Sequence, residues 1–222
     1  NAGWAEPEPL FRSTARSHSA LLQALKRYGP RLLRRGPLRK RLAVLHLLLF
    51  DAMALVARER PDARLVLAGG KPDQVERARG EARKAGIEGV TTFAGERPAS
   101  EIPAYLAACD VLVSPRSKGT NTPLKIYQYL RAGRAIVATR LLTHTQVLDD
   151  QVAVLVGATP AEFASGIVRA LGNREFSAEI GRQAQALAER KYSYEAYLEK
   201  TRRACVALQG NTAPLAPVKG LA

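Results

Sequence analysis

Short apolar segments alternate along this chain with longer segments whose apolar residues recur at helical spacing, and connections of only a few residues join them. Segments such as VLV (111–113) and AIVA (135–138) are apolar throughout, which is typical of strands buried on both faces of a parallel sheet. We therefore predict an α/β fold with a doubly wound parallel sheet and helices on both faces. Five strands are expected to share one sheet, near residues 64–69, 89–94, 110–114, 135–138 and 152–156.

Helices are expected between and after these strands. The segment SEIPAYLAACD is predicted to be helical with Ser100 as its N-cap. Pro123 and Gly133 are expected to lie at the two ends of a further helix. The other helices are predicted near residues 47–60, 73–85, 160–172, 175–190 and 194–208.

Composition divides the chain into three segments. Of the net charge of +14, +8 falls in residues 1–50, which contain ten Lys or Arg, two Glu, no Asp and no Ile. We predict a basic N-terminal segment (1–46), a folded domain (47–208) and a disordered tail (209–222). Upstream of the first predicted helix, LAVLH (42–46) is the only candidate strand. The abrupt change of composition suggests a truncated or frame-disrupted gene product.

Several classes of protein and site are disfavoured by the sequence. Cys109 and Cys205 lie far apart, so no disulfide framework and no CxxC metal site is indicated. The three histidines lack metal-ligand spacing, and no catalytic residue, metal or cofactor is assigned. No GxGxxG, GxxxxGK or GxSxG motif occurs, which argues against a dehydrogenase, a P-loop ATPase and a hydrolase. No membrane-spanning run and no signal peptide is recognised, so we expect a cytoplasmic location.

The most informative stretch is SPRSKGTNTPLKIYQYLRAG (114–133), where a predicted strand ends in a polar loop that leads into a helix. Gly119 permits close backbone approach, the hydroxyls of Thr120 and Thr122 can donate, and Lys125 is expected one turn into the helix. Free amides at a helix N-terminus can hold a phosphate. The alternative interpretation is an ordinary loop with a capped helix.

Together with PDARLVLAGG, VTTFAGERPASEIPAYLAACDVLV, AIVAT and THTQVLDDQVAVLV, this stretch resembles the C-terminal domain of GT-B glycosyltransferases of family 4 type, also called glycosyl transferases group 1. The resemblance runs from about Phe50 to Ala207. It implies a Rossmann-like domain that binds a nucleoside diphosphate sugar and takes part in transfer of the sugar to an acceptor. The donor is then a substrate, and no cofactor is required.

The resemblance also implies a donor site. Gly69 and Gly70 would match the loop after the second strand, the region from Phe93 to Gly95 would flank the nucleobase, and Gly119 to Thr122 would receive the pyrophosphate. Many members carry glutamates where this chain has Lys118 and Gln128, and another acidic position is Gln146 here. The implied donor-binding residues are Gly69, Gly70, Phe93, Gly95, Lys118, Gly119, Thr120, Asn121, Thr122, Lys125 and Gln128.

A complete enzyme of this family has two Rossmann-like domains, and residues 30–46 contain no match to the first strand and basic phosphate loop of the second one. We expect the missing domain to come from elsewhere, for instance from a partner chain, and the chain alone to be weakly active or inactive. One alternative is a noncatalytic sugar-nucleotide-binding subunit. Another is peripheral contact of the basic N-terminal arm with an anionic membrane, with nucleic acid the less favoured partner.

Overall fold

The computed structural model describes residues 43–208. The predicted tail (209–222) and nearly all of the predicted basic segment (1–46) lie outside the described residues. The boundary predicted at residue 47 falls inside the first described helix, whereas the predicted end at residue 208 coincides with the end of the last one.

The described helices and strands follow one another as predicted, strand and helix in alternation. In chain order they are α2 (Ala43–Glu59), β1 (Leu65–Ala68), α3 (Pro72–Lys84), η1 (Glu88–Val90), β2 (Thr91–Gly95), η2 (Ala99–Glu101), α4 (Ile102–Ala108), β3 (Val111–Ser114), α5 (Lys125–Ala132), β4 (Ala135–Thr139), α6 (Leu142–Thr145), β5 (Val154–Val156), α7 (Pro160–Gly172), α8 (Arg174–Tyr192) and α9 (Tyr194–Leu208).

Three local predictions were wrong. Residues 43–46 of the candidate strand LAVLH belong to α2. Ser100 lies within η2, and Glu101 is the N-cap of α4. α5 begins at Lys125 rather than near residue 122, because Pro123 and the residues before it remain in the loop. The end of α5 is as predicted, with Gly133 at a left-handed φ of 63° that glycine adopts without strain.

All strand pairs are parallel, but the strands form two sheets rather than the predicted single one. One sheet pairs β1 with β2, and the other has the order β3-β4-β5. Among residues 43–208 no strand joins them. The physical reason is that the strand which would precede α2 in a doubly wound sheet is absent from the described chain. The α/β class with a Rossmann-like arrangement is nevertheless confirmed.

Helices cover both faces of the three-stranded sheet. Along β4 the side chains alternate: Ala135 and Val137 face a core shared with α2, α3 and α7, whereas Ile136 and Ala138 face a core shared with α5 and α8. Every residue of β4 is buried. This double burial explains why its sequence is an uninterrupted apolar run.

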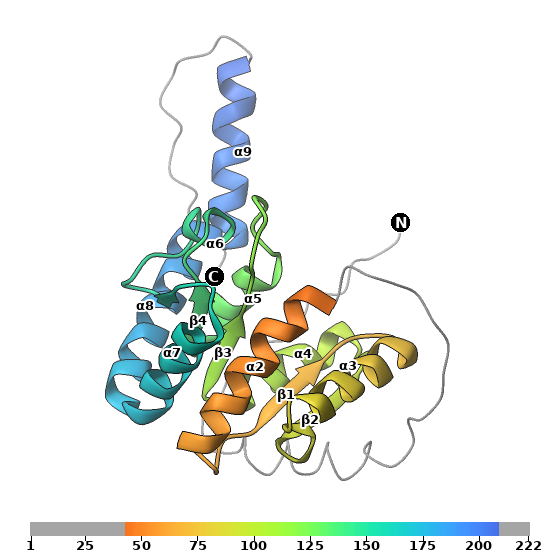
Figure 1. Cartoon of the computed structure of the whole chain (residues 1–222). Helices are drawn as coiled ribbons and strands as arrows, with labels where there is room; N and C mark the ends of the chain where they lie inside the picture. Colours follow the sequence, from red (N-terminus) through yellow and green to blue (C-terminus); the bar gives the residue numbers. More distant parts are fainter. Residues whose placement is uncertain (1–42, 209–222) are drawn as a thin grey trace.

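Helix α2 links the two sheets. Figure 1 shows it between α7 and α3, and it packs against both helices. Its buried residues Leu49, Met53 and Val56 recur at helical spacing and belong to the same core as Leu65 of β1 and Val137 of β4. The two sheets are thus held together by side-chain packing beneath one helix layer rather than by backbone pairing.

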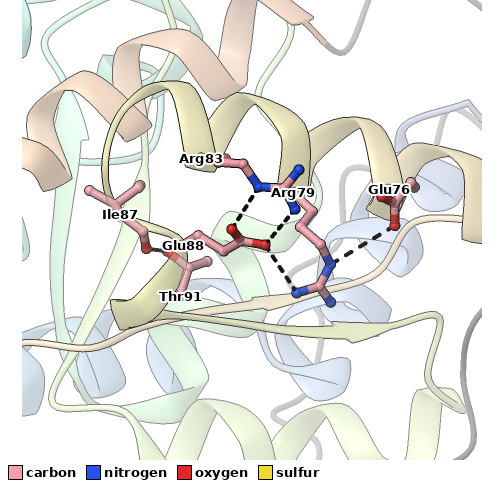
Figure 2. Close-up of polar contacts among 6 residues, drawn as sticks. All are labelled: Glu76, Arg79, Arg83, Ile87, Glu88 and Thr91. Atoms are coloured by element: carbon pink, nitrogen blue, oxygen red, sulfur yellow. Dashed lines mark hydrogen bonds and ion pairs between the residues drawn. The ribbon is translucent and has the colours of Figure 1, made fainter.

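A cluster of charged residues connects α3 to η1, the short helical turn directly before β2 (Figure 2). Glu88 of η1 accepts from Arg83 at 2.8 Å and lies 3.9 Å from Arg79, which also approaches Glu76 at 4.0 Å. The hydrogen bond from Arg83 holds the pKa of Glu88 below its usual value. Close by, the buried Thr91 hydroxyl donates to the Ile87 carbonyl at 2.7 Å. These contacts fix the turn from which β2 starts.

Gly181 of α8 tests how closely the helices pack. A Cβ at this position would lie 2.3 Å from the Gly133 carbonyl oxygen, so Gly181→Ala must push α8 away from the end of α5. We expect it to lower the free energy of unfolding by about 1–3 kcal/mol. Gly80→Ala on α3, where a Cβ meets open space, is the matched control and should be neutral or stabilising by up to about 1 kcal/mol. Urea unfolding of both variants measures the difference, and equal stabilities would contradict the close contact.

Candidate functional site

The first group of implied donor-binding residues lies where β1 and β2 end. Gly69 and Gly70 follow β1 with φ values of 113° and 90°, and the Gly69 amide donates to the Gly95 carbonyl at 2.7 Å. Both glycines and Phe93 line one shallow pocket together with Leu67, Ala68, Gln74, Val75 and Ala78. The structure therefore brings Gly69, Gly70 and Phe93 together, with Gly95 directly bonded to the same turn.

One face of the Phe93 ring is covered by a cation. The Arg79 guanidinium lies 4.8 Å from the ring centroid, and the same side chain belongs to the charged cluster of Figure 2. Arg79 was not identified from the sequence as part of this region. In the sequence, Arg79 lies on a helix rich in charged residues, where nothing distinguishes it from an ordinary surface residue.

The second group lies in the loop between β3 and α5. Gly119 has a φ of 132°, which strains any residue with a side chain. A Cβ at this position would lie 3.0 Å from Nη1 of Arg116, so the absence of a side chain also leaves room for the guanidinium under the loop. Lys118 and Thr120 are exposed beside it.

Helix α6 and the residue after it hold this loop in place. Gln146 accepts from the Thr122 hydroxyl at 3.2 Å and donates to the Thr120 carbonyl at 2.9 Å. Thr143 donates to the Asn121 carbonyl at 2.5 Å. Gln146 stands where the resemblance implies an acidic residue. Its amide both donates to and accepts from the loop, whereas an ionised carboxylate could only accept.

Lys125 occupies the first residue of α5, not a position one turn into it as predicted. Its Nζ donates to the Val113 carbonyl at 3.4 Å, and the Tyr129 hydroxyl donates to the same carbonyl at 3.3 Å. The amides of Ile126 and Tyr127 bond within the first turn, to Pro123 and Leu124. These two amides therefore form hydrogen bonds within the first turn of α5. The Lys125 side chain contacts the end of β3.

The charge of Arg116 acts on Lys125 at this point. Burial lowers the pKa of Lys125 to about 8, and the nearby Arg116 contributes in the same direction. Among residues 43–208, the buried Nε of Arg116 has no hydrogen-bond partner. Burial likewise raises the pKa of Tyr129 to about 12, so its hydroxyl stays protonated and remains a donor. Two partly buried cations without a hydrogen-bonded carboxylate in the described part of the chain favour the arrival of an anion.

His144 organises the strand ends beneath the loop. The fully buried ring donates from Nδ1 to the Thr139 carbonyl at 2.8 Å, and its Nε2 accepts from the Ser114 hydroxyl at 3.0 Å. The Thr139 hydroxyl in turn accepts from the Arg116 amide at 3.1 Å. This network ties β3 to β4 and fixes the start of the loop. His144 therefore orders the loop through contacts within the described chain.

Gln128 is exposed on α5. Within residues 43–208 no three His, Cys, Asp or Glu side chains gather as a metal site would require. No helix in the same part of the chain is both long and apolar enough to cross a bilayer.

Comparison with known proteins shows what this arrangement is similar to. The structure of the Anabaena protein HepE in complex with UDP matches with a TM-score of 0.67 and 21% identity over 89% of this chain and 54% of that one. The C-terminal domain of LpcC, a glycosyl transferase group 1 family protein from Francisella tularensis, matches with a TM-score of 0.60 and 20% identity over 70% of this chain and 83% of that domain. No curated protein matches significantly in sequence.

The parallel strands with helices on both faces match the C-terminal, Rossmann-like half of GT-B glycosyltransferases. The family model of glycosyl transferases group 1 matches residues 30–173, and the chain belongs to this family. The match begins upstream of the described residues, earlier than the resemblance noted from Phe50. The chain spans about half the length of the matched HepE chain.

The buried state of His144 predicts how stability depends on pH. Burial lowers the pKa of His144, with Lys125 and Arg116 adding to the effect, while the unfolded chain keeps the ordinary value of 6.5. The unfolded state therefore binds more protons below pH 6.5, and stability falls as the pH is lowered from 7 to 5. Each unit of pKa difference corresponds to about 1.4 kcal/mol.

Urea unfolding at pH 7 and pH 5 checks this expectation. His144→Gln should be less stable than the original chain at pH 7, because the Ser114 and Thr139 contacts are disturbed. It should lose less further stability on acidification. If both proteins lose the same amount between pH 7 and pH 5, His144 does not carry the dependence.

Proposed function

We propose that this chain is the donor-binding half of a family 4 type glycosyltransferase, which binds a nucleoside diphosphate sugar for transfer of the sugar to an acceptor. The nucleobase is assigned to the pocket of Gly69, Gly70 and Phe93, and the diphosphate to the loop from Lys118 to Thr122 with Lys125. The observations that carry the proposal are the Lys125 ammonium at the Val113 carbonyl, near the carboxyl end of β3, and the unpartnered buried Nε of Arg116 among the described residues, within a domain of this family.

The chemistry of the two regions fits the two parts of such a ligand. The first region offers glycine backbone and an aromatic ring, which suit a planar base. The second offers two cations, hydroxyls and a glycine at the end of parallel strands, where α/β proteins bind phosphates. UDP is the first nucleotide to test, because structures of the similar HepE contain UDP and UDP-glucose.

Binding and turnover are expected to separate. Sugar transfer requires an acceptor held against the donor, and positioning of this kind supplies roughly 7–11 kcal/mol of barrier reduction. The described residues form one Rossmann-like half. We therefore expect nucleotide binding by this chain with little transfer, and a cytoplasmic setting in which a second domain or partner chain completes the cleft. A noncatalytic sugar-nucleotide-binding subunit would show the same binding and no transfer with any partner.

Titration calorimetry with UDP tests the site. Lys125→Met should weaken binding about 10- to 150-fold, the equivalent of one charge-assisted contact of 1.5–3 kcal/mol. The control Lys84→Met removes the same charge from an exposed position on α3 and should leave the affinity nearly unchanged. Equal affinities of the Lys125→Met variant and the original chain would place the diphosphate elsewhere.

The pH dependence of binding gives a second test of the same residue. The pKa of Lys125 is about 8 in the free protein, so its positive charge is lost as the pH rises from 7 to 9. UDP affinity should fall over this interval, and binding near pH 8 should take up protons, because the bound diphosphate favours the charged lysine. Lys125→Met should bind weakly with little pH dependence. An original chain whose affinity is constant from pH 7 to 9 would exclude Lys125 from the contact.

A further inference from the structure

We propose that Gln74 recognises the base of the nucleotide. Its side-chain amide donates a hydrogen bond to an exocyclic carbonyl, so the pocket selects nucleoside diphosphates of uracil or guanine over those of cytosine or adenine. The inference rests on the proposed function, because it concerns the pocket to which the nucleobase is assigned. It adds the chemical class of the base and a specificity-determining residue that the sequence does not single out.

Gln74 carries the one polar side chain that lines this pocket in the described part of the chain. Eight residues line the pocket, and the other seven are glycine, alanine, valine, leucine or phenylalanine. Gln74 lies in the first turn of α3, which packs against β2, the strand that carries Phe93 (Figure 1). In a mostly apolar pocket a few polar groups fix the orientation and the identity of the ligand. Side-chain recognition of the base edge is therefore assigned to Gln74.

The oxygen of the Gln74 amide is already engaged. Oε1 accepts from the backbone amide of Lys71 at 2.9 Å, a contact of the kind that caps a helix N-terminus. A backbone N–H can bond only the oxygen of a side-chain amide, so Nε2 is the end that remains for a ligand. Within residues 43–208, Nε2 makes no hydrogen bond. The free end therefore offers hydrogens and no lone pair, which makes it a donor to a base and not an acceptor.

The glycine turn after β1 holds the Gln74 amide in place. A Cβ on Gly70 would lie 3.6 Å from Cβ of Gln74 and 3.7 Å from its Oε1, so the glutamine side chain lies directly against this turn. The turn is itself fixed to the end of β2, because the Gly69 amide donates to the Gly95 carbonyl at 2.7 Å. A donor whose side chain is already ordered loses little further entropy when it bonds a ligand. It also discriminates between partners better than a mobile donor does.

The chemistry of the bases gives this donor its selectivity. A planar base packs its faces on apolar side chains such as Phe93, and its hydrogen-bonding edge then needs polar partners. Uracil and guanine carry an exocyclic carbonyl on that edge, and this carbonyl accepts from Nε2. Cytosine and adenine carry an amino group at the corresponding position, which would face Nε2 donor to donor. Because an unsatisfied donor in a partly buried site is costly, the pocket discriminates between the two classes of base.

Titration calorimetry of the full chain with two matched pairs of nucleotides, UDP with CDP and GDP with ADP, tests the inference. The original chain should bind the carbonyl-bearing member of a pair about 5- to 150-fold more tightly than the other. Gln74→Glu keeps an oxygen for the Lys71 amide and replaces the nitrogen donor by an acceptor, so its preference should reverse toward CDP or ADP. The ratio of the two affinities is the readout, because the added negative charge repels both diphosphates alike. Gln74→Met removes the donor without adding a charge, and its two affinities should become equal.

Gln151→Glu is the matched control, because it makes the same exchange at an exposed position before β5 and should leave both ratios unchanged. Urea unfolding checks that Gln74→Glu retains the original stability, as its kept capping contact requires. Equal affinities of the original chain within each pair, or a preference that both Gln74 variants leave unchanged, would overturn the inference and leave the nucleotide site in place. Failure of all four nucleotides to bind would instead overturn the proposed function, and this inference with it.

Discussion

The packing of α2 against α7 is the contact on which the rest of the structure depends. No backbone pairing joins the two sheets within residues 43–208, so the apolar face of α2 is the main link between them. Phe163 and Ile167 of α7 belong to the same core, and α7 itself covers β3, β4 and β5. A loss of side-chain volume between α2 and α7 would therefore affect the relative position of two sheets and not one helix alone.

The relative position of the sheets matters because the candidate site is divided between them. The glycines and Phe93 belong to the β1-β2 sheet, whereas the loop from Lys118 to Thr122 follows β3 of the other. A ligand that contacts both regions must bridge the space that α2 covers. Each half of the site is well formed by local contacts: Gly69 with Gly95 in one, and Gln146 with Thr120 and Thr122 in the other.

The helices and strands were largely predictable. An uninterrupted apolar run such as AIVAT indicates a strand buried on both faces, and a glycine such as Gly133 indicates the end of a helix. The division into two sheets was not, since strand pairing depends on which segment lies between β1 and β3 and not on either strand alone. At the site, the need for glycine at 119 could be inferred from its place in a polar loop. The partners of Arg116, Ser114 and His144 could not, because these contacts join residues up to thirty positions apart.

The separation into two sheets also bears on how the chain folds. The pair β1-β2 closes through α3 over a short stretch of sequence, and β3, β4 and β5 likewise pair with their neighbours in the chain. The contacts within each sheet are closer in sequence than those between α2 and α7. The docking of α2 on α7 instead brings together segments about a hundred residues apart, with the loop-closure entropy that this involves. The contact that positions the two sheets is therefore also the one whose formation closes the longest loop.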